Sequence, residues 1–331
     1  MFLVLLVYLA TFRSRSVGTD YSMYSGFFFM TNEQLKAIYI EKGYLIIYSI
    51  ARWINNFYFV PFISFLLFFI GLYRFSKEIK MSTEILLGFL VCSYLYCSSL
   101  NGIRQMSAIG IIFLALSLYL NTSILVKHRW LNVILYVSIV SIASLFHSSA
   151  WFALLLPLVE YIPINSIWVF FGGLLTTIGF FTKLVSGIMP KLVLLFPHYV
   201  EKYNGVDNSF FIDPSSKGII GFLPVLTQFI FLFLICYYAR NFIKLNKFIS
   251  AGYFAYLLLF IGGGNFTVTR VQAYLLPFLI FFYGKYVQDN TDNIARLRSS
   301  WFKVIILLFF TIYFIFRLAR NISGVVPFIL G

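Results

Sequence analysis

The sequence predicts an all-α fold: one integral-membrane domain, residues 1–331, built as a polytopic bundle of transmembrane helices. Of the 331 residues, 61% are hydrophobic and only 11% are charged, whereas a soluble domain has roughly 25% charged residues. About eleven long apolar runs, separated by short polar breaks, fill most of the chain. The alternating pattern of membrane β-strands is absent, so the chain is expected to cross the bilayer as helices.

The first apolar run, residues 1–12, lacks the basic start and the small-residue cleavage site of a secretory signal, so we expect a membrane helix there. A polar loop, 13–43, and an amphipathic stretch, 44–55, form the first long loop. A second long loop, 183–217, includes an interfacial segment at Leu184–Phe196. The other predicted spans are 56–73, 82–100, 105–121, 130–147, 149–162, 166–182, 218–239, 248–264, 271–287 and 303–320.

Lysine and arginine gather in four short loops, which all fall on one side of the membrane if the first helix starts inside. This side is therefore predicted to be cytoplasmic, and both long loops, with most of the acidic residues, are predicted to face outward. The same bias explains the net charge of +14, so no nucleic acid is expected as a partner. The basic residues are Arg74, Lys77, Lys80, Lys127, Arg129, Arg240, Lys244, Lys247, Lys285, Arg296, Arg298 and Lys303.

Arg104 is one of the few charged residues at the predicted outward boundary, within the segment Asn-Gly-Ile-Arg-Gln that ends at Gln105. It is expected to begin a helix, where free backbone N–H groups and the helix dipole attract anions. The planar guanidinium adds a fork suited to phosphate. The alternative is an arginine that extends to lipid headgroups.

His147 lies in the segment Phe-His-Ser-Ser-Ala-Trp, which joins two predicted spans with almost no loop. A turn so close to the hydrocarbon requires protein or water around its backbone. Because histidine titrates near neutrality, His147 is a candidate general base or phosphate ligand. The alternative is a histidine that caps the turn by bonding to Ser148 or Ser149.

Arg270 follows a triple glycine, 262–264, and is predicted to open the next helix as Arg104 does. Tyr274, one helical turn later, shares a face with it. The pair is a candidate anion site, and the alternative is an interfacial anchor. Glycines without a following GKS or GKT are a weak phosphate-loop signal.

The first long loop supplies two candidate carboxylates, Asp20 and Glu41, which are suited to sugar hydroxyls or to proton transfer. The three cysteines lie in apolar runs without metal-ligand spacing. The sequence also has no Asp-x-Asp, HExxH or GxSxG motif. No metal site and no cofactor are therefore expected.

Taken in order, these segments resemble the EpsG-like group of Wzy-type bacterial polymerases, which make O antigen and exopolysaccharide. The resemblance covers most of the chain. It rests on Gly-Thr-Asp-Tyr-x-x-Tyr at 18–24, Glu-x-Gly-Tyr at 41–44, Asn-x-x-Arg-Gln at 101–105, Phe-His-x-Ser-Ala at 146–150 and Arg-x-x-x-Tyr at 270–274.

The resemblance implies a metal-independent glycosyltransferase of the bacterial inner membrane, with its active site facing the periplasm. Such an enzyme transfers a growing glycan from undecaprenyl diphosphate to a lipid-linked repeat unit. By carry-over, Arg104, Arg270, Gln105 and Tyr274 would bind the diphosphate, and His147 would assist. Asp20 and Glu41 would be catalytic candidates at the acceptor hydroxyl. Suggested protein partners are a chain-length regulator and a flippase of the same pathway.

Two other functions stay open at this point. A flippase or transporter of lipid-linked oligosaccharide is less favoured because the candidate residues gather on one predicted side and no internal repeat is evident. A ligase similar to O-antigen ligases shares the donor chemistry and differs only in its acceptor.

Overall fold

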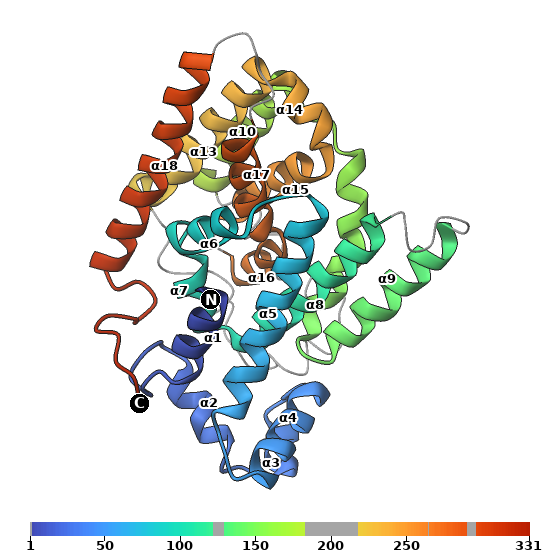
Figure 1. Ribbon diagram of the computed structural model, residues 1–331, viewed down its shortest axis with the longest axis vertical. Helices are drawn as coiled ribbons and strands as arrows, with labels where there is room; N and C mark the ends of the chain where they lie inside the picture. The colour runs from blue at the N-terminus through green and yellow to red at the C-terminus, as the bar shows by residue number, and fades with distance from the viewer. Residues whose placement is uncertain (1, 122–128, 183–217, 264, 290–295) are drawn as a thin grey trace. The chain divides into compact units, whose positions relative to one another are not determined.

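The computed structural model describes residues 2–121, 129–182, 218–263, 265–289 and 296–331 (Figure 1). Apart from one antiparallel bridge between Arg13 and Leu330, these residues contain helices, turns and loops, with no β-strand. The all-α prediction is confirmed for them. The chain divides into two compact units, residues 1–154 with 307–331, and residues 155–306.

The first unit holds α1 Phe2–Thr11, α2 Tyr21–Phe27, α3 Asn32–Ala37, α4 Lys42–Trp53, α5 Phe59–Glu78, α6 Thr83–Cys92, α7 Leu95–Ser99, α8 Ile103–Leu120 and α9 Arg129–Ser144. The 3-10 helix η1, Ser148–Tyr161, begins in the first unit and ends in the second. The second unit holds α10 Ser166–Thr182, α13 Ile219–Tyr238, α14 Arg240–Leu245, α15 Lys247–Leu258, η3 Leu259–Gly262, α16 Phe266–Leu275 and α17 Pro277–Gln288. The last helix, α18 Arg296–Ala319, begins in the second unit and ends in the first.

In the described part of the chain, four helices are long and apolar enough to cross a membrane: Phe59–Glu78, Ile103–Leu120, Gly221–Tyr238 and Ser300–Ala319. Shorter apolar helices of 10–17 residues accompany them. The chain is thus a helical membrane protein, while the number of eleven spans stays a prediction. The second long loop at 183–217, with its segment Leu184–Phe196, and the basic residue Lys127 lie outside the described residues.

Tyr94 divides the predicted span 82–100 into two helices, α6 and α7. Its backbone is left-handed, with φ 66°, a conformation that an α-helix cannot include. The side chain is buried, and the guanidinium of Arg317 lies 4.7 Å from the centre of its ring. Hydropathy alone could not show this break, because both halves are apolar.

The predicted span 271–287 is likewise divided, into α16 and α17, at Pro277. Proline has no backbone N–H and cannot donate to the preceding helical turn. It is well placed as the first residue of the new helix α17.

The core of the first unit forms where α5 crosses α8, side by side in Figure 1. Gly71 of α5 meets Gly110 of α8 so closely that a Cβ on Gly71 would lie 1.8 Å from the Gly110 carbonyl oxygen. Small residues allow such close approach, which drives helix association in membranes. The crossing therefore fixes the position of α8.

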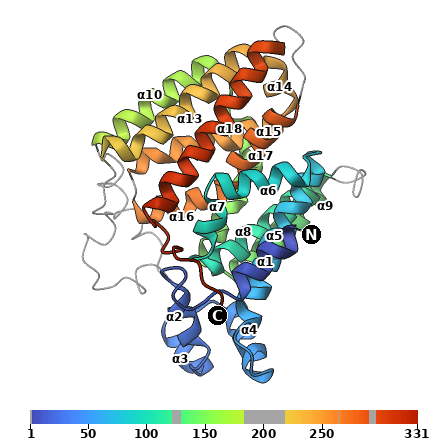
Figure 2. The same cartoon turned by 60° about the vertical axis from the view of Figure 1, so that its left-hand side comes forward.

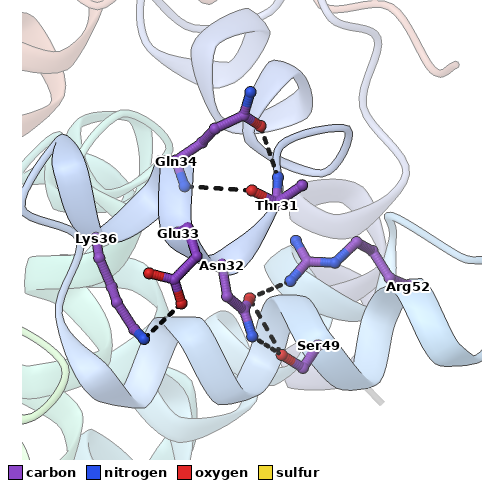
Figure 3. A network of polar contacts seen from close by, with 7 residues as sticks. All are labelled: Thr31, Asn32, Glu33, Gln34, Lys36, Ser49 and Arg52. Atoms are coloured by element: carbon purple, nitrogen blue, oxygen red, sulfur yellow. Dashed lines mark hydrogen bonds and ion pairs between the residues drawn. The ribbon is translucent and has the colours of Figure 1, made fainter.

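Helices α2, α3 and α4 gather at one end of the first unit in both Figure 1 and Figure 2. Figure 3 shows polar contacts of α3 and α4. Thr31 and Gln34 form a capping box that starts α3. Asn32 donates to Ser49 of α4 at 2.9 Å, and Arg52 donates to Asn32. These bonds fix α3 against α4.

The second unit has a buried polar contact among its apolar helices. The hydroxyl groups of Tyr253 in α15 and Tyr283 in α17 lie 2.8 Å apart, and Tyr253 also donates to Gln228 of α13 at 3.1 Å. All three side chains are buried. Buried polar groups that satisfy one another specify how their helices pack.

Candidate functional site

Arg104 is the second residue of α8, a helix that begins directly after Gly102. Its place at a helix N-terminus agrees with the sequence prediction. The side chain is 19% exposed, and its guanidinium interacts with the hydroxyl of Tyr24 in α2. Gln105, beside it, is half-buried.

Glu41 immediately precedes α4 and is held against the turn that carries His147. The Gly43 N–H donates to the Leu145 carbonyl oxygen at 2.8 Å, and a Cβ on Gly43 would lie 2.7 Å from that oxygen. The glycine of the Glu-x-Gly-Tyr motif therefore permits the close approach. As a result, Oε1 of Glu41 lies 3.3 Å from Nδ1 of His147.

The other oxygen of Glu41, Oε2, accepts a hydrogen bond from Arg104. Burial would raise the pKa of Glu41, but the interaction with His147 and the charge of Arg104 outweigh it and lower the pKa to about 2. Glu41 is therefore ionised at neutral pH. Three predicted site residues from distant parts of the sequence meet in one cluster, which we call the Glu41–Arg104–His147 cluster.

Tyr44 fixes this cluster from within the core. Its hydroxyl lies 2.6 Å from Ser64 Oγ of α5 and 2.8 Å from Ser107 Oγ of α8, and it donates to the Ile103 carbonyl at 3.1 Å. The side chain is fully buried. The start of α4 is thus bonded to the same turn of α8 that carries Arg104.

Arg13 is a buried cation that the sequence analysis did not assign to the site. It donates to the carbonyl oxygens of Ala10 at 2.9 Å and Leu100 at 2.5 Å, and its guanidinium lies 3.9 Å from the Tyr21 ring centre. Burial lowers the pKa of Arg13 to about 10, so it stays protonated at neutral pH. Its position directly after an apolar run was the available signal, since charge there is costly.

Asn101 connects the start of α8 to two other segments. Its Oδ1 accepts from the Thr19 N–H at 2.9 Å, and its Nδ2 donates to the Ser323 carbonyl at 3.1 Å. Gly18, with φ +94°, allows the contact, because a Cβ there would lie 2.7 Å from Asn101 Oδ1. The motif that begins at Gly18 therefore supports the turn before Arg104.

Asp20 is not part of the cluster in the contacts of the described residues. Its Oδ1 accepts from Thr19 Oγ1 at 2.9 Å, and it lies directly before α2. The structure therefore separates the two predicted carboxylates: Glu41 meets the cationic residues, and Asp20 supports the loop.

Arg270 and Tyr274 belong to the second unit, where both lie in α16. Tyr274 is buried and Arg270 is half-buried, one helical turn apart. The prediction that Arg270 opens this helix is wrong, because α16 begins at Phe266. Asn265 starts the helix earlier: its side-chain oxygen accepts from the Val268 N–H at 3.4 Å, as at a helix N-cap.

Among the described residues, no group of three His, Cys, Asp or Glu side chains is placed to hold a metal ion. The cluster has instead one guanidinium, one carboxylate and one imidazole. Such a set can neutralise an anion, orient an imidazole and move a proton.

Comparison with known proteins identifies one matching family. No curated protein and no solved structure matches the chain. The EpsG family profile matches residues 1–330, which is nearly the entire sequence. The chain therefore belongs to the EpsG family and is a membrane protein of the polysaccharide-polymerase type.

Proposed function

We propose that the protein is a glycosyltransferase that polymerises lipid-linked repeat units of an O antigen or exopolysaccharide. It would transfer the growing glycan from undecaprenyl diphosphate to a sugar hydroxyl on the next lipid-linked unit, at the periplasmic face of the inner membrane. The observation that carries the proposal is the Glu41–Arg104–His147 cluster, in a chain of the EpsG family. A chain-length regulator and a flippase are its proposed partners.

In this proposal, Arg104 contacts the diphosphate and stabilises the charge that develops as it leaves. Its hydrogen bond to Glu41 and its contact with Tyr24 fix the guanidinium before substrate arrives, and a fixed donor loses little freedom on binding. Gln105, next to Arg104, is proposed as a further ligand of this diphosphate. Arg270 and Tyr274, in the second unit, are proposed to hold diphosphate charge on the donor or the acceptor. The transfer is a direct displacement at the anomeric carbon, which inverts its configuration.

The test is polymer length in cells that lack the gene, complemented with wild type, Arg104→Ala, Arg270→Ala or His147→Ala at matched membrane expression. A polymerase predicts single repeat units on the surface lipid in the deletion strain, and failure of the arginine variants to restore long chains. Accumulation of lipid-linked units on the cytoplasmic side would identify a flippase. Long polymer retained only on the carrier lipid would identify a ligase, and full-length surface polymer would refute a role in its assembly.

A further inference from the structure

Glu41 contacts both of the other members of the cluster, through different oxygens. Oε2 accepts from the Arg104 guanidinium, and Oε1 lies 3.3 Å from Nδ1 of His147. Oε1 also accepts a long hydrogen bond, 3.5 Å, from the Ser148 N–H. The carboxylate is thus positioned between the proposed diphosphate ligand and the imidazole.

We propose that Glu41 is a positioning residue that orients His147 through Nδ1, so that Nε2 of His147 accepts the proton from the sugar hydroxyl. This inference rests on the proposed function. It identifies His147 as the general base and takes that role away from both carboxylates, Glu41 and Asp20.

Carboxylate chemistry supports this assignment. An ionised carboxylate accepts hydrogen bonds only, so it favours the tautomer that has its proton on Nδ1 and its lone pair on Nε2. It also stabilises the imidazolium that forms when Nε2 takes a proton. Glu41 suits this role because its pKa is lowered to about 2, which keeps it ionised. As a base it would be poor, since a useful base has a pKa near the working pH.

The surroundings of Glu41 hold it in this orientation. Gly43 allows the backbone to touch Leu145, and Tyr44 bonds the start of α4 to α5 and α8. The titratable groups that act on Glu41 in the described residues are Arg104 from α8, His147 from the turn before η1 and Tyr24 from α2. Arg104 and His147 both favour the ionised carboxylate.

The acceptor oxygen attacks the anomeric carbon and forms the new glycosidic bond, while its proton moves to Nε2 of His147. The bond from the anomeric carbon to the diphosphate oxygen breaks, and its electron pair leaves with undecaprenyl diphosphate next to Arg104. The imidazolium then releases its proton to water, which restores the neutral base.

The experiment measures rates of the full-length protein in lipid nanodiscs with lipid-linked repeat units, from pH 5 to pH 9. Glu41→Gln is expected to lower kcat by about 10²- to 10⁴-fold, because a glutamine amide can donate to Nδ1 and favour the tautomer with the proton on Nε2. It should also move the acidic limb of the rate profile to lower pH. Glu41→Asp, which keeps the charge, should retain that limb with a smaller loss of kcat.

Two comparisons separate positioning from a general structural effect. Glu33→Gln removes an exposed carboxylate of α3 and should leave kcat and the pH profile unchanged. In a His147→Ala background, Glu41→Gln should reduce kcat by less than threefold, because residues that act as a unit are not additive. In this background, Glu41→Gln still raises KM, because it alters the carboxylate that holds Arg104.

The outcomes distinguish this inference from the proposed function. If wild type makes polymer, but Glu41→Gln keeps the wild-type kcat and pH profile, the inference is wrong and the polymerase stands. Equal kcat losses from Glu41→Gln with and without His147 would also overturn it. If wild type makes no polymer from units that a known polymerase extends in parallel, the proposed function fails.

Discussion

At the scale of single residues, the contacts of Glu41 with His147 and Arg104 keep its carboxylate ionised. Its pKa is lowered from 4.5 to about 2, so ionised Glu41 stabilises the folded state. The contribution is complete above pH 4.5 and disappears as the pH falls towards 2. A shift of this size corresponds to about 3 kcal/mol.

We therefore expect wild type to lose more thermal stability than Glu41→Gln when the pH is lowered from 6 to 3. The free-energy gap between the two proteins should narrow by about 2 kcal/mol, because over this range Glu41 of the unfolded wild-type chain binds its proton while most of the folded protein keeps it ionised. Thermal unfolding of both proteins in detergent, at each pH, measures this gap. Glu33→Gln, at an exposed site, is the matched control and should parallel wild type. A constant gap over this range would contradict the role of the Glu41 charge.

Arg104 allows a second residue-scale prediction, which concerns shape and not charge. Arg104→Lys keeps one positive charge but loses the planar fork that reaches Glu41 and Tyr24 together. We expect its rate of polymerisation to fall at least tenfold, since it no longer holds both groups. Polymer length and membrane abundance, measured together, test this. Arg15→Lys, at an exposed site in the same unit, is the control and should behave as wild type.

At the scale of helices, the contact between α5 and α8 depends on two glycines. A Cβ on Gly71 would lie 1.8 Å from the Gly110 oxygen, and one on Gly110 would lie 2.3 Å from the Leu67 oxygen. Both obstacles are backbone atoms, so the helices would have to separate. The start of α8, with Arg104, would then move.

Gly71→Ala and Gly110→Ala are therefore each expected to reduce the amount of folded protein in the membrane by more than half. Overpacking of this kind costs on the order of 1–3 kcal/mol or more. Gly88→Ala in α6 is the matched control, because no atom lies within 4 Å of its Cβ position. Size-exclusion profiles of the solubilised proteins provide the measurement. A normal profile for Gly71→Ala would show that the helices do not pack this closely.

Gly43 makes a comparable contact at the start of α4, where the obstacle is the Leu145 carbonyl oxygen, 2.7 Å from its Cβ position. We expect Gly43→Ala to remain folded but to polymerise at least tenfold more slowly, since it moves Glu41 away from His147. Gly26→Ala in α2 has no atom within 4 Å and should be active. If Gly43→Ala polymerises at the wild-type rate, the contact does not position the site.

The sequence predicted helices well where an apolar run is also a continuous helix. The predicted range 166–182 matches α10, and 218–239 matches α13 within a residue at each end. It failed at Tyr94, where a left-handed residue breaks a uniformly apolar run. Pro277 indicated a break in the predicted span 271–287, but the prediction followed the continuous hydropathy and not the proline.

The sequence predicted which residues belong to the site, but it did not predict which of them contact one another. Arg104 and His147 could be selected because charged or titratable groups are rare at the ends of apolar runs, and Glu41 was one of two candidate carboxylates in the first long loop. Their meeting depends on the approach of Gly43 to Leu145 and on the bonds of Tyr44. Such long-range contacts have no local signature, so the sequence could not separate Glu41 from Asp20.

At the scale of the whole molecule, the net charge of +14 agrees with loops rich in lysine and arginine that the positive-inside rule predicts to be cytoplasmic. The proposed function requires the opposite side for the cluster, because the lipid-linked substrate is extended there. The orientation of the chain is therefore the property on which the proposal depends most. It can be measured without any knowledge of the sugar.

Cysteine labelling in spheroplasts tests this orientation, in a variant whose native Cys92, Cys97 and Cys236 are replaced by serine. We expect Lys36→Cys, on α3 five residues before Glu41, to react with a membrane-impermeant maleimide in intact spheroplasts. Lys77→Cys and Arg240→Cys, in predicted cytoplasmic loops of the two units, should react only after permeabilisation. All three native side chains are exposed, so lack of reaction reports sidedness and not burial. The reverse pattern would place the cluster in the cytoplasm and refute polymerisation at the periplasmic face.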